Sequence, residues 1–174
     1  RYLWKLWRRR PLIVFSGNYH ANSYPKWGPD GGRKIIPYGI SEEFRSVSAQ
    51  KDAPPPRAIF TSSPQRGLSW LLDVWHYRIH DKMPEAELHI YSGAATYGTH
   101  GARRAVQMQP ILDKASSLRG SNIFLHDPVP KQDLVKVLSQ SRVLVYRGDP
   151  GETFCLAVGE AQAAGIPAVV KDIG

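Results

Sequence analysis

The 174-residue sequence has one cysteine, fewer acidic than basic side chains, and no long apolar run. Cys155 alone cannot form an internal disulfide or build a structural zinc site, so a reducing compartment and a cytoplasmic location are expected. No apolar stretch approaches the roughly 20 residues that span a bilayer, which argues against a transmembrane segment. Hydrophobic residues make up 42% and charged residues 22%, which fits an ordered globular chain better than a disordered one.

Acidic residues are absent from the first ten positions, RYLWKLWRRR, which carry five cations. The whole chain has 23 Lys and Arg against 15 Asp and Glu, so these ten residues supply +5 of the net +8. Trp, Tyr and Leu side chains lie between the cations, a pattern typical of peripheral contact with an anionic membrane surface. A helix that packs its Trp and Leu side chains on the domain explains the pattern equally well. Specific nucleic-acid binding is not expected, because no recognition motif follows.

Strands and helices alternate along the chain after a proline-rich linker at 46–56. We therefore predict two parts, residues 1–50 and residues 51–174. Strands are predicted at 12–15, 57–61, 86–91, 122–125, 142–146 and 168–170, a loop at 17–33, and helices at 66–81, 102–118 (kinked at Pro110), 131–140 and 153–164. Apolar strands that alternate with helices predict an α/β, Rossmann-like parallel sheet with helices on both faces.

Such sheets bind ligands where their strands end, and two acids lie just beyond the strand predicted at 142–146. Glu152 and Glu160 are eight positions apart, about two turns of the predicted helix, so both can face the same way. A carboxylate can accept hydrogen bonds from both hydroxyls of a sugar diol. A helix-capping acid and a solvated glutamate would give the same spacing, so the spacing by itself leaves both interpretations open.

Groups that could hold a phosphate lie near the two acids. The helix predicted at 153–164 opens with free backbone N–H groups, which favour an anion. Arg66, after the strand at 57–61, could add a cation. Acids for a diol and donors for a phosphate together suit a nucleotide sugar. The backbone groups concerned are those of Phe154, Cys155 and Leu156.

Several segments resemble motifs of glycosyltransferase family 4 and follow one another in the same order as in that family. Residues 152–170, ETFCLAVGEAQAAGIPAVV, resemble its E-x7-E signature. Residues 35–40, IIPYGI, resemble its I-P-N-G-V segment, and residues 60–67, FTSSPQRG, resemble its G-R-L-x-x-x-K-G loop. Residues 122–125 and 142–145 fall where its later strands do. The resemblance spans roughly residues 13–174.

The resemblance implies a GT-B architecture, in which two Rossmann-like domains face a cleft. Residues 51–174 would be the second, donor-binding domain, and residues 1–50 would hold a remnant of the first. The implied activity is transfer of a hexosyl group from a nucleoside-diphosphate sugar with retention of configuration, with no metal or other cofactor required. Polysaccharide biosynthesis is the expected role, and a partial enzyme without its first domain is expected to transfer poorly. The alternative is a non-catalytic Rossmann-like module that docks to a membrane surface or partner through its basic start.

The resemblance also implies roles for individual residues. Glu152 would be catalytic, contacting the donor sugar near its reacting carbon, and Glu160 would bind the ribose hydroxyls. Arg66 stands where the family has a Lys that neutralises the diphosphate. Ser62 falls at an Arg of the family and Cys155 at a Gly, which implies a variant donor site. In the family, the residues near the base of the nucleotide fall at positions that here include His126 and Val129.

Overall fold

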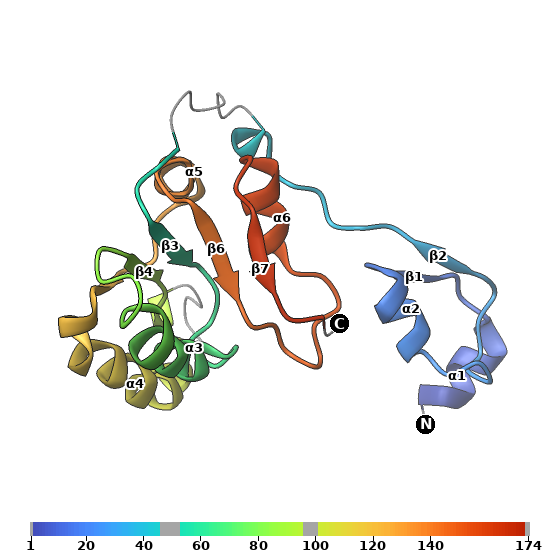
Figure 1. Cartoon of the computed structure of the whole chain (residues 1–174). Coiled ribbons are helices and arrows are strands. Elements are labelled where there is room, and N and C mark those ends of the chain that lie inside the picture. The colour runs from blue at the N-terminus through green and yellow to red at the C-terminus, as the bar shows by residue number, and fades with distance from the viewer. Residues whose placement is uncertain (1, 46–52, 96–100, 173–174) are drawn as a thin grey trace.

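The computed structural model describes residues 2–45, 53–95 and 101–172, with side chains of helix α4 described from residue 104 onward. Five strands form one parallel sheet in the order β5–β4–β3–β6–β7 (Figure 1). This confirms the predicted α/β class and all five strands expected after residue 56. The strands are β3 (Arg57–Phe60), β4 (Glu87–Tyr91), β5 (Ile123–His126), β6 (Val143–Tyr146) and β7 (Ala168–Val170).

Helices cover both faces of this sheet because the chain reverses its direction of travel across it. From β3 the chain moves outward to β4 and β5, then returns to β6 and β7 on the other side of β3. Right-handed crossovers therefore place the first two helices on one face and the last on the other. The short helix η1 (Glu42–Phe44) contacts both later helices, so these share a face. The four helices of this domain are, in chain order, α3 (Leu68–Val74), α4 (Gly101–Ser117), α5 (Lys131–Ser139) and α6 (Leu156–Ala163).

The core lies between the central strands and their helices. Ile59 and Phe60 of β3, Leu88 and Ile90 of β4, and Leu144 of β6 are all buried. Beyond α3, the predicted helix continues as a π-helical turn, η2 (Trp75–Ile79). The indole nitrogen of buried Trp75 donates to the Ser121 carbonyl, 2.9 Å away in the short helix η4 (Arg119–Ser121), and so ties this turn to the start of β5.

One helix prediction needs correction. The last helix begins at Leu156 rather than near residue 153, so Glu152 lies in the turn before α6 and not on it. The helix predicted at 102–118 is confirmed as α4, which is helical on both sides of Pro110, and the kink there stays a prediction. Proline deprives the carbonyl of residue 106 of its usual donor, but Val106 is 76% exposed, so water can replace that donor.

Residues 2–35 form a smaller unit with its own two-stranded parallel sheet, visible as the blue ribbons of Figure 1. The predicted 17–33 loop contains an unpredicted six-residue helix. Residues 46–52 of the predicted linker lie outside the described residues. Among the helices that the structure describes, none is both long and apolar enough to cross a bilayer. The small N-terminal unit with the two-stranded sheet consists of α1 (Tyr2–Arg9), β1 (Ile13–Phe15), α2 (Asn18–Ser23) and β2 (Arg33–Ile35).

Candidate functional site

A cavity of about 390 Å³ lies beyond the carboxyl ends of β3 and β6, at the start of α6. The loop after β3, the turn after β6 and the first turns of α5 and α6 meet there. Seven of the nine residues predicted to contact the donor line this cavity: Ser62, Arg66, Glu152, Phe154, Cys155, Leu156 and Glu160. The sheet thus brings Ser62 and Glu160, which are 98 positions apart in the sequence, to one place.

Glu152 is held by two donors from neighbouring elements. The Nη1 atom of Arg66 and the hydroxyl of Tyr146 each lie 2.6 Å from the same carboxylate oxygen, Oε2. The turn that presents Glu152 is closed by its own backbone N–H, which donates to the Asp149 carbonyl over 2.8 Å. The carboxylate side chain is only 12% exposed, so these two charge-assisted hydrogen bonds replace contacts with water that the acid has largely lost.

Arg66 owes its position to a tight loop. Its backbone N–H donates to the Ser63 carbonyl over 2.9 Å, and the Ser92 hydroxyl donates to the Ser62 carbonyl over 2.6 Å. Gly67 then turns the chain into α3 with a φ of +84°, a left-handed conformation that glycine adopts without strain. Burial opposes the charge on Arg66, but the Tyr146 hydroxyl and the Glu152 carboxylate outweigh it and raise the pKa of the guanidinium.

Glu160 is the more buried of the two acids. It lies in the middle of α6 with 6% of its surface exposed, and its Oε1 atom is ion-paired with Lys131. Lys131 is the first residue of α5, and its ammonium group also lies 5.5 Å from the ring centre of Phe44. The two acids are therefore separate in the fold, one in a loop beside an arginine and one on a helix beside a lysine.

Sequence reasoning missed two residues of this site. Lys131 lines the cavity, and only its position just beyond the end of β5 could have indicated it. Tyr146 is the last residue of β6 and 4% exposed, and it resembles any other strand-ending aromatic residue in the sequence. Burial, and then its hydrogen bond to Glu152, raise the pKa of the Tyr146 phenol. Burial likewise raises the pKa of the Cys155 thiol, which disfavours a thiolate at the start of α6.

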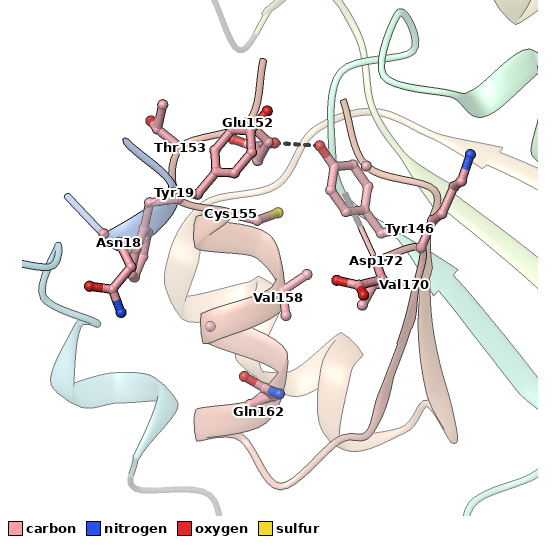
Figure 2. A pocket seen from close by; sticks show the side chains of 15 residues that line it. Asn18, Tyr19, Tyr146, Glu152, Thr153, Cys155, Val158, Gln162, Val170 and Asp172 are labelled. Carbon is pink, nitrogen blue, oxygen red and sulfur yellow. Dashed lines mark hydrogen bonds between the residues drawn. The ribbon is translucent and has the colours of Figure 1, made fainter. Parts of the chain in front are cut away.

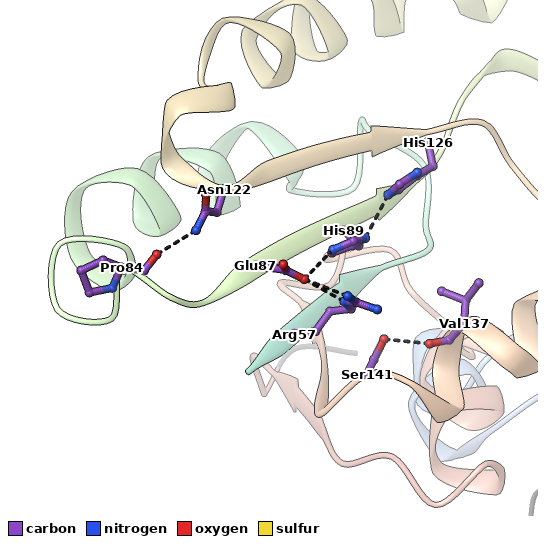
Figure 3. A network of polar contacts seen from close by, with 8 residues as sticks. All are labelled: Arg57, Pro84, Glu87, His89, Asn122, His126, Val137 and Ser141. Carbon is purple, nitrogen blue, oxygen red and sulfur yellow. Dashed lines mark hydrogen bonds and ion pairs between the residues drawn. The ribbon is translucent and has the colours of Figure 1, made fainter. Parts of the chain in front are cut away.

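His126 and Val129 are not among the residues that line this cavity. The His126 ring stacks on Tyr91 with centroids 4.4 Å apart, and its Nε2 lies 2.9 Å from Nδ1 of His89. His89 in turn contacts Glu87 at 3.1 Å, which pairs with Arg57 (Figure 3). Val129 packs against the hydrophobic core. The imidazole of His126 is thus engaged in a network on the sheet face, and base contact by these two residues stays a prediction.

A larger cavity, of about 580 Å³, adjoins the first one across residues 152–155, which line both. Its walls come from α2, from the ends of β6 and β7, and from α6, whose Val158 and Gln162 border it in Figure 2. Tyr19 of α2 secures the turn by donating to the Pro150 carbonyl over 2.9 Å. Arg66, Lys131 and Glu160 line the smaller cavity and not the larger one, whose lining includes Lys171 and Asp172 instead.

The smaller cavity combines the groups that a phosphorylated sugar requires. Glu152 and Glu160 offer carboxylate oxygens to hydroxyl donors, and Arg66 offers a charged guanidinium to an anion. Leu156 opens α6, where backbone N–H groups and the helix dipole also favour negative charge. Within the described ranges, no cluster of three or more His, Cys, Asp or Glu is arranged to hold a metal ion.

The sequence matches the family model described as "Glycosyl transferases group 1" over residues 55–174. This match covers more than half of the chain, includes the whole five-stranded sheet, and contains every group of the smaller cavity except Tyr38. The chain belongs to this family of glycosyl transferases. No curated protein matches the sequence.

Solved structures of GT-B glycosyltransferases share the fold. Sucrose-phosphate synthase from Thermosynechococcus elongatus is 17% identical, with a TM-score of 0.67, and the match covers 94% of this chain and 41% of that one. TarM is 17% identical, with a TM-score of 0.63 and coverages of 92% and 29%. An E. coli trehalose-6-phosphate structure bound with UDP-2-fluoro glucose is 13% identical, with a TM-score of 0.64 and coverages of 92% and 45%. The chain thus spans less than half the length of these proteins.

Proposed function

We propose that this chain is the donor-binding part of a retaining glycosyltransferase that uses a nucleoside-diphosphate sugar. The observation that supports this most strongly is the convergence of Glu152, Glu160 and Arg66 on one cavity at the start of α6. Family membership supports glycosyl transfer, and the charges of the cavity support a donor that has both hydroxyls and phosphates. Retention, independence of metal ions and a role in polysaccharide biosynthesis are proposed on the resemblance to family 4.

The proposed roles follow the chemistry of each side chain. Glu160 accepts hydrogen bonds from the ribose hydroxyls. Arg66, together with the backbone N–H groups around Cys155, neutralises the diphosphate, which is otherwise a poor leaving group because of its charge. Glu152 contacts hydroxyls of the transferred sugar near its reacting carbon, and Ser62 supplies a neutral donor in place of a second cation. His126 and Val129 remain candidates for the base end of the nucleotide.

A further part of the protein is proposed to complete the β1–β2 unit. A two-stranded parallel sheet is too small to be stable alone, because parallel strands normally have neighbours and cover on both faces. Val14 of β1 is 49% exposed and Ile36, just after β2, is 53% exposed, so apolar surface remains open around both strands. We propose that residues 1–50 belong to a first domain that adds strands to this sheet and faces the donor cavity.

The basic helix α1 favours a second candidate function, docking to an anionic membrane surface. Trp4 is 64% exposed and Trp7 is 50% exposed, and none of the described residues of α1 is buried. Exposed tryptophans among arginines match a lipid interface, where the rings enter the headgroup layer and the cations meet anionic lipid. Cytoplasmic location at such a surface is part of this proposal. Co-sedimentation with phosphatidylglycerol vesicles, with and without residues 1–10, tests it.

Calorimetric titration of the chain with UDP, GDP and ADP tests the donor-binding proposal. At least one nucleotide should bind, and Glu160→Ala should weaken that binding by about 1–3 kcal/mol through the loss of charge-assisted bonds. No heat with any of the three, together with vesicle binding that disappears when residues 1–10 are removed, would instead support the docking module.

A further inference from the structure

We propose that Lys131 and Glu160 together recognise the ribose of the nucleotide, and that Lys131 makes this chain selective for ribose over 2′-deoxyribose. The inference rests on the proposed function and adds a residue to it. Neither the sequence motifs nor the family match singles out Lys131.

The two side chains come from different helices and meet at the wall of the smaller cavity. Lys131 is the first residue of α5, directly after Pro130, and its ammonium group is ion-paired with Oε1 of Glu160 on α6. The lysine side chain is 54% exposed, whereas the glutamate side chain is 8% exposed. Lys131 therefore has open space toward the cavity while its tip remains fixed on a buried acid.

The position of the ammonium group is fixed from two sides. It lies 5.5 Å from the ring centre of Phe44, a fully buried residue of η1 that packs in the core beneath it. An aromatic face attracts a cation through its quadrupole, and the carboxylate attracts it through its charge. A lysine with two such contacts loses less freedom on binding a ligand than a fully solvated lysine would.

A sugar diol needs both an acceptor and a donor. Each hydroxyl presents one proton and two lone pairs, so a carboxylate satisfies the protons and leaves the lone pairs without a partner. An ammonium group has three protons and can donate to a hydroxyl oxygen while it keeps its bond to the acid. The Lys131–Glu160 pair thus supplies both halves of the hydrogen bonding that a cis-diol requires, and the Oε2 atom of Glu160 accepts no hydrogen bond within the described part of the chain.

A structural role for the ion pair predicts a different outcome. If Lys131 only compensates the buried charge of Glu160, its loss weakens the binding of every nucleotide by the same factor or destabilises the fold. If it also contacts the diol, its loss reduces the advantage of ribose over deoxyribose. The ratio of the two affinities separates these roles, because changes in overall charge or in stability cancel in it.

The test compares the tightest binder among UDP, GDP and ADP with its 2′-deoxy counterpart by calorimetry. The wild-type chain should prefer the ribonucleotide by about tenfold or more, the effect of one charge-assisted hydrogen bond. Lys131→Gln should reduce this preference to about threefold or less, whereas Lys131→Arg should keep more of it and retain the fold. Lys136→Gln is the matched control, on the same helix but 75% exposed and paired with Asp133.

Each outcome decides between the proposals. An equal loss of affinity for both nucleotides in Lys131→Gln, or an unchanged ratio, would overturn the ribose inference and leave the donor site intact. A wild-type chain that binds nucleotides without preferring ribose would also overturn it. A wild-type chain that binds none of the three would overturn the proposed function, and this inference with it. Should Lys131→Gln fail to fold, the Lys131→Arg ratio decides, since loss of the preference in that folded variant contradicts the inference.

Discussion

The Tyr146 hydroxyl and the Arg66 guanidinium both bond to Oε2 of Glu152, each at 2.6 Å. Tyr146 ends β6, and Glu152 follows six residues later, so the turn between them brings the acid back over the strand that precedes it. Figure 2 shows the carboxylate and the phenol pointing at one another at the edge of the larger cavity. Two donors on one oxygen fix the orientation of the carboxylate and direct its other oxygen elsewhere.

Replacement of Tyr146 by Phe should therefore disturb catalysis more than nucleotide binding. The ring is retained, but Glu152 loses one charge-assisted hydrogen bond. A hydrogen bond to a charged group contributes about 1.5–3 kcal/mol. We expect kcat of the complete transferase to fall about tenfold or more, with the dissociation constant for the nucleoside diphosphate within about twofold. Tyr77→Phe, at a residue that is 67% exposed, is the control. Equal losses of kcat and nucleotide affinity would contradict a role specific to Glu152.

Removal of Arg66 should weaken binding of the diphosphate. Arg66→Ala removes the nearest guanidinium from the cavity and leaves Glu152 with Tyr146 alone. Affinity for the nucleoside diphosphate should fall about 10- to 100-fold, and Arg66→Lys should recover part of it. Calorimetry measures both variants. Arg45→Ala, in an exposed pair 3.2 Å from Glu42, should bind as the wild type does, and a similar loss there would mean that net charge is responsible.

Gly67 should tolerate no side chain. Alanine there would be forced into a left-handed conformation at φ +84°, with its Cβ 2.8 Å from the Cβ of Arg147. We expect Gly67→Ala to lower the free energy of unfolding by about 1–2 kcal/mol or more and to displace Arg66. Urea denaturation measures the loss. Gly120→Ala, where a Cβ meets nothing within 4 Å, should cost far less, and comparable losses at both positions would refute the steric argument.

The neighbouring histidines of β4 and β5, His89 and His126, should make stability depend on pH. Burial lowers the pKa of His89 and of His126 below the ordinary 6.5, and Arg57 adds to the effect on both. Below about pH 6.5 these histidines therefore bind protons more readily in the unfolded chain than in the folded chain. The free energy of unfolding is highest above about pH 6.5 and falls as the pH decreases. The urea midpoint should drop between pH 7.5 and pH 5.5. His126→Phe should flatten this slope, and a midpoint that rises on acidification would contradict it.

Much of the fold followed from patterns in the sequence. Runs such as Ala58-Ile59-Phe60 predicted strands buried on both faces, and Gly165 with Pro167 predicted the end of α6. The start of α6 was misjudged because residues 149–152 form a turn, closed by the Glu152 N–H and the Asp149 carbonyl, and Cys155 is still extended just before α6. Helical periodicity does not report such a turn. The α2 helix was missed because its sequence, NYHANS, has no apolar face.

The candidate site was predictable only in part. Glu152, Glu160 and Arg66 could be named as candidates because they carry charges suited to a sugar phosphate and fall on segments that resemble family motifs. Tyr146 and Lys131 were not, because their roles depend on which side chain they meet, and that depends on how β6 and α5 pack against the rest of the sheet. Pairs such as Lys131 with Glu160 join residues 29 positions apart through tertiary structure alone.

A crystal structure of the chain with its tightest-binding nucleoside diphosphate tests the central claim most directly. The account predicts the ribose hydroxyls within hydrogen-bonding distance of Glu160, and the diphosphate between Arg66 and the start of α6. A nucleotide bound elsewhere on the molecule, with Glu160 and Arg66 still making only their present contacts, would contradict it.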